Sequence, residues 1–117
     1  MEQPIILPHG GYRQLKSYRK SLIVFDGTCC FVRRFIPVGD RTGDQMIQAA
    51  RSGKQNIVEG SMASAVSKET EIKLTGVARA SMEELLEDFR DHLRIHRLPQ
   101  WDKDSKPVLA LLALSRA

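Results

Sequence analysis

The chain has 117 residues, of which 42% are hydrophobic and 27% charged, and this composition excludes disordered, collagen-like and low-complexity proteins. Aromatic residues make up only 6%, which favours helices over a β-sandwich. The formal net charge is +4, and residues 1–60 carry the whole excess, with nine Lys and Arg against five Asp and Glu. No apolar run approaches the ~18 residues that span a bilayer, and the N-terminus lacks a signal-peptide pattern. The sequence therefore predicts a soluble, cytoplasmic protein with no membrane partner.

The chain begins with a predicted extended N-terminal arm, residues 1–11, because its prolines and glycines do not continue a helix. A first helix of about 24 residues follows, in which apolar residues recur in alternating steps of three and four. Pro37 and Gly39 end it. Gly27 lies inside it, and a close helix contact would explain its cost of up to ~1 kcal/mol relative to alanine. The predicted apolar stripe consists of Leu15, Tyr18, Leu22, Phe25, Cys29, Val32 and Ile36.

A second helix is predicted to begin after Asp40, which is a favourable N-cap residue. Its apolar and small residues occupy more than one side, and such a helix is usually covered on more than one side. This pattern predicts contacts beyond the helix's own bundle, to another subunit. The main stripe consists of Met46, Ala50, Gly53, Ile57 and Gly60.

Ser67 is the predicted N-cap of a third helix, which has acidic residues in its first turn and runs to about His96. Pro107 then begins a fourth, almost wholly apolar helix of about ten residues. Together these elements predict an all-α fold, an antiparallel up-down four-helix bundle with a short fourth helix, formed by residues 12–117 as one domain. The inward stripe of the third helix is predicted to be Leu74, Val77, Ala78, Ser81, Leu85, Phe89 and Leu93.

Motifs for catalysis or nucleotide binding are absent, so the sequence predicts no enzyme activity, no catalytic residue and no cofactor. His92 and His96 lie one turn apart without a third ligand, which favours solvated histidines and no metal site. The adjacent Cys29 and Cys30 are predicted to be reduced thiols, one packed in the core and one beside it. A hydrolase that uses Glu59 or the carboxylates of residues 83–91 is the minority alternative.

Three polar residues of the second helix occur among small and apolar positions: Arg51, Asn56 and Glu59. Burying such groups is costly unless they are hydrogen-bonded. We therefore predict a structural polar cluster in which Glu59 is buried and accepts hydrogen bonds from an arginine or from backbone donors.

The first helix is the most basic part of the chain, and no acid lies between Glu2 and Asp26. A surface of this kind suits polyanions such as RNA. Two alternatives stay open, a solvated helix face and a face covered by the acidic segment 83–91 of a neighbouring subunit. The candidate nucleic-acid-binding residues are Arg13, Lys16, Arg19, Lys20, Arg33 and Arg34.

Four runs of the sequence resemble a known family. RSGKQNIVEGSMA (51–63) resembles the R…NIAEG signature of the four-helix-bundle proteins of 23S rRNA intervening sequences, and ARASMEELL (78–86) resembles a segment of that family's third helix. The runs LPHGGYRQLKSY (7–18) and SKETEIKLTGVARAS (67–81) are most similar to its four-helix-bundle suffix-domain subgroup. The family's long fourth helix is here reduced to the ALLAL segment.

The resemblance implies a bacterial, ring-forming bundle, typically a homopentamer. It also implies kinship with the accessory variability determinant of diversity-generating retroelements, a basic protein that binds nucleic acid and a reverse transcriptase. The expected function is thus a non-catalytic, oligomeric helical scaffold that binds structured RNA or an RNA-bound protein. The alternative is a protein-interaction or self-assembly module that binds no nucleic acid.

Overall fold

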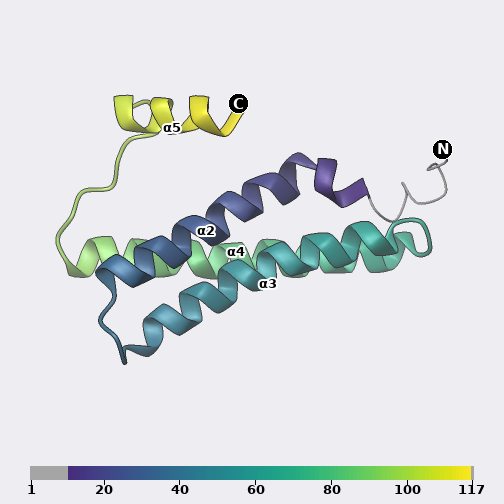
Figure 1. Cartoon of the computed structure of the whole chain (residues 1–117), viewed down its shortest axis with the longest axis horizontal. Helices are drawn as coiled ribbons and strands as arrows, with labels where there is room; N and C mark the ends of the chain where they lie inside the picture. The colour runs from purple at the N-terminus through teal and green to yellow at the C-terminus, as the bar shows by residue number, and fades with distance from the viewer. Residues whose placement is uncertain (1–10, 117) are drawn as a thin grey trace. The chain divides into compact units, whose positions relative to one another are not determined.

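The computed structural model describes residues 11–116, and all the regular elements in this range are helical (Figure 1). A short 3₁₀ helix, η2, is followed by four α-helices, so the predicted all-α class is confirmed for the described residues. The predicted arm, apart from Gly11, lies outside them. The elements are η2 (Gly11–Gln14), α2 (Lys16–Phe35), α3 (Arg41–Ala63), α4 (Lys68–Ile95) and α5 (Lys106–Arg116).

The helices begin and end close to the positions that the sequence predicts. The side chain of Asp40 accepts a hydrogen bond from the Thr42 backbone N–H at 2.9 Å and caps α3. The Ser67 hydroxyl accepts one from the Thr70 N–H at 3.1 Å at the start of α4. Both side chains satisfy donors that a helix N-terminus leaves without a partner, and both predicted caps are confirmed.

At the C-terminal end of α4, an arginine occupies a backbone position that is usually taken by glycine. The backbone N–H of Leu98 donates to the Leu93 carbonyl at 2.8 Å, and that of Arg97 donates to the Arg94 carbonyl at 3.1 Å. This is the Schellman pattern, in which the left-handed position is usually glycine. Here Arg97 occupies it, with φ of 57°. The chain leaves the helix at this residue, two residues before Pro99 and close to the predicted end at His96.

The chain falls into two units, Met1–Leu86 and Glu87–Ala117. In the first unit, α2 and α3 form an antiparallel helical hairpin (Figure 1). A methyl group at Gly43, near the start of α3, would lie 2.7 Å from Cγ1 of Val32, near the end of α2. Further along the pair, the Lys54 ammonium lies 5.4 Å from the centre of the Phe25 ring. Residues late in α2 therefore contact residues early in α3, and earlier residues of α2 contact later residues of α3, so the two helices are antiparallel.

The first part of α4 packs against a second side of α3. The hydroxyls of Ser52 and Ser81 share a hydrogen bond of 2.8 Å, and Gly53 faces the side chain of Met82. A methyl group at Gly60 would lie 3.6 Å from the Glu71 carbonyl oxygen of α4. The small residues of α3 are thus covered by α2 and α4 of the same chain, so they no longer require the second subunit that the sequence predicted.

The interior of this unit is small, and small residues dominate it. The buried hydrophobic side chains among the described residues are Met46, Ala49, Ala50, Ala78 and Leu85. From α2, the most buried side chains are Ser21 and Thr28, while most of the predicted apolar stripe is half-buried and Leu15 is exposed. Ser21 donates to the Tyr18 carbonyl at 2.6 Å, whereas the Thr28 hydroxyl is buried with no hydrogen-bond partner.

The second unit contains the last turns of α4 and the predicted short helix, which is confirmed as α5 with Pro107 in its first turn. Several of its leucines are 40–72% exposed. That the four helices form an up-down bundle stays a prediction. So does the single domain over residues 12–117.

The cap of α3 has a consequence for acid stability. The hydrogen bond from the Thr42 backbone N–H holds the pKa of the Asp40 carboxyl below its usual value. Because the folded-state pKa is lowered, the cap's stabilisation is present above the unfolded value of about 4 and is lost as the pH falls through the folded value. We expect wild type to lose more stability than Asp40→Asn between about pH 5 and pH 2, because asparagine caps without titrating. Urea unfolding midpoints check this, and identical acid profiles would contradict it.

Candidate nucleic-acid interface

The side of α2 that points away from α3 forms a continuous exposed surface, which we term the outer face of α2. A helix turns 100° per residue, so this surface lies opposite the buried Ser21 and Thr28. All its members are exposed, and none is aromatic. The outer face of α2 consists of Lys16, Arg19, Lys20, Ile23, Asp26, Gly27, Cys30, Arg33 and Arg34.

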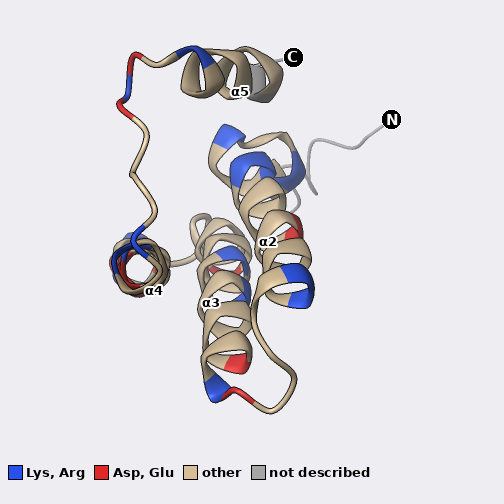
Figure 2. Ribbon diagram, turned by 90° about the vertical axis from the view of Figure 1, so that its left-hand side faces the viewer, with Lys and Arg blue, Asp and Glu red and all other residues tan. Residues whose placement is uncertain are grey.

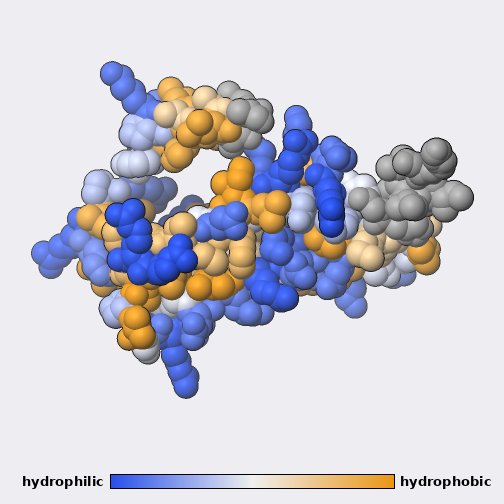
Figure 3. Space-filling view, in the orientation of Figure 1, coloured by the Kyte–Doolittle hydropathy of each residue, from blue (hydrophilic) through white to orange (hydrophobic). Residues whose placement is uncertain are grey.

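Positive charge gathers at both ends of this face. Three cations lie in the first turns of α2 and two in its last turn, with the acid Asp26 between them (Figure 2). At 1.5 Å per residue the two groups are about 23 Å apart along the helix. Figure 3 shows hydrophilic surface near both ends of α2 and apolar surface between them. The face therefore offers two separated cationic contact points on one rigid element.

The predicted binding residues are exposed, and their recorded contacts leave their charges uncompensated. Arg19 donates to the Gln14 carbonyl at 3.3 Å. The Arg13 guanidinium lies 5.8 Å from the centre of the Tyr12 ring, and a hydrogen bond with that tyrosine raises the pKa of Arg13. Neither partner is a carboxylate, so these cations keep their attraction for anions.

Arg33 and Arg34, in the last turn of α2, also contact neutral groups. Arg33 donates to the sulfur of Cys30 at 3.6 Å, and the Arg34 guanidinium lies 5.6 Å from the centre of the Phe35 ring. The ion pairs Lys68–Glu71, Glu87–Arg90 and Asp91–Arg94 lie within α4. Structure and sequence agree that α2 carries accessible positive charge.

The predicted polar cluster of α3 does not form. Asn56 donates to the Ser52 carbonyl at 2.8 Å and to its hydroxyl at 3.2 Å, as a structural residue should. Arg51 and Glu59 are exposed, so the prediction of a buried Glu59 is wrong. The reason is rotational, because Glu59 lies on the side of α3 opposite Met46 and Gly53. A polar contact between α3 and α4 joins Ser52 to Ser81, a residue predicted only as part of the inward stripe of the third helix.

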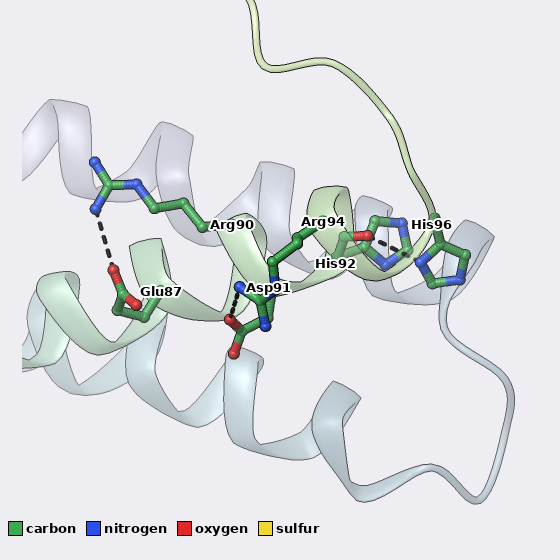
Figure 4. Close-up of polar contacts among 6 residues, drawn as sticks. All are labelled: Glu87, Arg90, Asp91, His92, Arg94 and His96. Carbon is green, nitrogen blue, oxygen red and sulfur yellow. Dashed lines mark hydrogen bonds and ion pairs between the residues drawn. The ribbon is translucent and has the colours of Figure 1, made fainter.

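The last turns of α4 carry the acids and histidines singled out in the sequence (Figure 4). Glu87 pairs with Arg90 at 3.1 Å and Asp91 with Arg94 at 2.9 Å, so these acids are partly neutralised on their own helix. The His92 and His96 rings lie 4.1 Å apart, and burial, with a smaller contribution from His96, lowers the pKa of His92.

Other candidate chemistry is sparse. Among the described residues, no group of three or more His, Cys, Asp or Glu is placed to hold a metal ion. Cys29 is half-buried and Cys30 is exposed, and both are free thiols. Among the described residues, the charged surfaces are therefore the strongest candidate for a functional site.

The described helices include none with both the length and the apolar character needed to cross a membrane. Comparisons with models of protein families, with curated proteins and with solved structures found no match to this chain.

Proposed function

We propose that this chain is a non-catalytic helical scaffold that binds nucleic acid, structured RNA in particular, through the outer face of α2. The observation that carries the proposal is the set of five exposed lysines and arginines on this face, with a single acid among them. Lysine and arginine contacts to phosphates release condensed counterions, which supplies most of the sequence-independent affinity for nucleic acids.

The residues of the outer face of α2 also favour binding to the phosphate backbone of a nucleic-acid duplex. It has no aromatic side chain on which an unpaired base would stack, and stacking is the main device of single-strand recognition. Its cations lie on a straight, rigid helix at two points about 23 Å apart, which suits the regular phosphate rows of a duplex. We therefore propose backbone-directed binding with low sequence specificity.

Two further elements belong to the proposal. A homo-oligomer, with a pentamer favoured, follows from the kinship that the NIVEG run implies, and a cytoplasmic location is proposed from the composition of the chain. An RNA-bound protein is an alternative partner, and self-assembly without nucleic acid is the alternative function. The exposed Ile23 on the same face, 56% accessible, favours that second candidate because isoleucine contributes more to a protein contact than to a phosphate contact.

The test is a salt-dependent binding titration. A fluorescently labelled RNA hairpin should bind wild type at low salt, and affinity should fall by roughly 0.7–0.9 in log slope per phosphate contact. Lys16→Glu with Lys20→Glu should weaken binding by about tenfold or more, because two cations become anions on the contact face. Fluorescence anisotropy measures the affinity, and circular dichroism verifies the helices.

The matched control makes the same change of charge elsewhere. Lys103 and Lys106 are exposed and lie off α2, so Lys103→Glu with Lys106→Glu should weaken binding much less. An equal loss in this control would show attraction to net charge alone and would remove the assignment to α2. Absence of binding by folded wild type at low salt would overturn the proposed function.

A further inference from the structure

The side of α4 that points away from α3 is a second charged surface, which we term the outer face of α4. It lies opposite the buried Ala78, Ser81 and Leu85, and all its members are exposed. It lies within the first unit. The outer face of α4 consists of Glu69, Ile72, Lys73, Gly76, Arg79, Ala80 and Glu83.

The surface beside Gly76, on one flank of this face, is open. A methyl group at Gly76 would meet no atom within 4 Å, and a space of about 510 Å³ opens beside it. All the described residues that line this space come from α4, so it is an open hollow on the helix surface rather than an enclosed pocket. The lining residues are Lys68, Glu71, Ile72, Thr75, Gly76 and Arg79.

The outer faces of α2 and α4 have the same layout with opposite charge. On α2, Lys20 lies seven residues before Gly27 and Arg34 lies seven residues after it. On α4, Glu69 and Glu83 lie at the same distances on either side of Gly76. Seven residues are about two turns, so each glycine lies in line with its two flanking charges.

The centres of the two faces are complementary as well. Asp26 lies beside Gly27 on α2, whereas Lys73 and Arg79 lie one turn before and after Gly76 on α4. Both glycines are exposed in helix interiors, where glycine costs up to ~1 kcal/mol relative to alanine, and a methyl group at either one would meet no neighbouring side chain or helix of the described residues within 4 Å. A helix that packs closely across the glycine would account for both.

We propose that a second copy of this chain packs the outer face of its α4 against the outer face of α2, antiparallel, with Gly76 opposite Gly27. Lys20 then meets Glu83, and Arg34 meets Glu69. Ile23 and Ile72, which are 56% and 65% exposed, are covered in the contact. The antiparallel direction also brings Arg19 towards Glu84, which is exposed on the flank of α4.

The occupant is a second copy because one chain does not bring these two faces together. Both α2 and α4 use their inner sides to pack on α3, so both outer faces point away from it. Each copy carries one face of each kind, so its two faces can engage two different neighbours in a heterologous contact. Such contacts produce rings when the rotation between copies closes and open filaments when it does not.

The contact regulates the proposed nucleic-acid site. On the basis of the proposed function, RNA and the neighbour's α4 require the same lysines and arginines of α2, so self-association and RNA binding exclude each other. Bound RNA should thus reduce the number of protein copies per particle. Excess RNA added to the wild-type oligomer, followed by light scattering, measures this.

The docking is tested first without RNA, by the mass in solution at tens of micromolar protein. Gly76→Gln should dissociate the oligomer because its side chain fills the contact, and the open space around Gly76 lets the fold tolerate it. Ala65→Gln introduces the same side chain at an exposed position off both faces and should leave the mass unchanged. A monomeric wild type, or an oligomer unaffected by Gly76→Gln, would overturn the docking.

A charge exchange then separates the docking from the RNA proposal. Lys20→Glu and Glu83→Lys should each weaken self-association by about tenfold or more, and the double variant should restore it. RNA binding should be weakened with Lys20→Glu, kept with Glu83→Lys and still weakened in the double variant. If the double variant restores association but the wild type does not bind RNA, only the proposed function is refuted. Failure of the double variant to reassociate would refute the docking alone.

Discussion

Met46→Ala is expected to lower the free energy of unfolding by about 2–5 kcal/mol. Met46 is fully buried in the second turn of α3, in a unit whose buried hydrophobic residues are otherwise mostly alanine. Truncation removes its contacts and leaves a cavity that its small neighbours are too short to fill. A domain of this size is stable by only about 5–15 kcal/mol, so the loss is a large part of the total.

Urea unfolding followed by circular dichroism measures the effect, and Met62→Ala is the matched control. Met62 lies on the same helix and is 50% exposed, so its truncation removes less contact area and should cost clearly less. If the two alanine variants lost the same free energy, the side of α3 assigned to the interior would be wrong.

Gly43→Ala and Gly27→Ala are expected to change stability in opposite directions. At Gly43 the added methyl group would lie 2.7 Å from Cγ1 of Val32 and 3.3 Å from Cγ2 of Ile36. Both neighbours are β-branched and have few alternative rotamers in or beside a helix, so the helices must separate. We expect a loss of about 1–3 kcal/mol, less what the better helix former regains.

At Gly27 the same substitution meets nothing within 4 Å. Alanine should therefore stabilise the isolated chain by about 0.5–1 kcal/mol, through helix propensity alone. Thermal unfolding of both variants, at a protein concentration at which the chain is monomeric, decides the signs. Stabilisation by Gly43→Ala would show that α2 and α3 are not in close contact at that end.

Helix positions were predictable from local chemistry. Asp40 and Ser67 cap the helices that they were expected to cap, and α2 ends just before Pro37. These signals depend on the few residues around each helix end, and tertiary contacts do not alter them.

The interior was less predictable. The stripe of large apolar residues on α2 was taken as its buried side, but Ser21 and Thr28, which lie beside that stripe, are the most buried residues of the helix. A periodic pattern gives the direction of a buried face only to within a broad arc, and small residues occupy the closest approach between helices. The same limit applies to Gly27, for which a close helix contact was predicted and which is exposed within the chain.

The candidate site was found in part. The basic residues of α2 were identified from composition, and the structure confirms that they are exposed. The outer face of α4 was missed, because in the sequence Glu83 belongs to the acidic segment 83–91 and Glu69 to the first turn of the third helix. The arrangement of Glu69 and Glu83 about Gly76 becomes visible only once the side of α4 that faces α3 is known.

The small residues along the covered sides of α3 affect the entropy of folding as well as its contacts. Glycine and alanine have no side-chain rotamers to lose, whereas a buried long side chain loses up to ~2 kcal/mol of rotamer freedom. The positions Gly43, Ala49, Ala50, Gly53 and Gly60 are all buried at no such cost. Ordering this interior therefore restricts fewer side-chain torsions than ordering a leucine-filled one of equal length, which offsets part of its smaller hydrophobic gain.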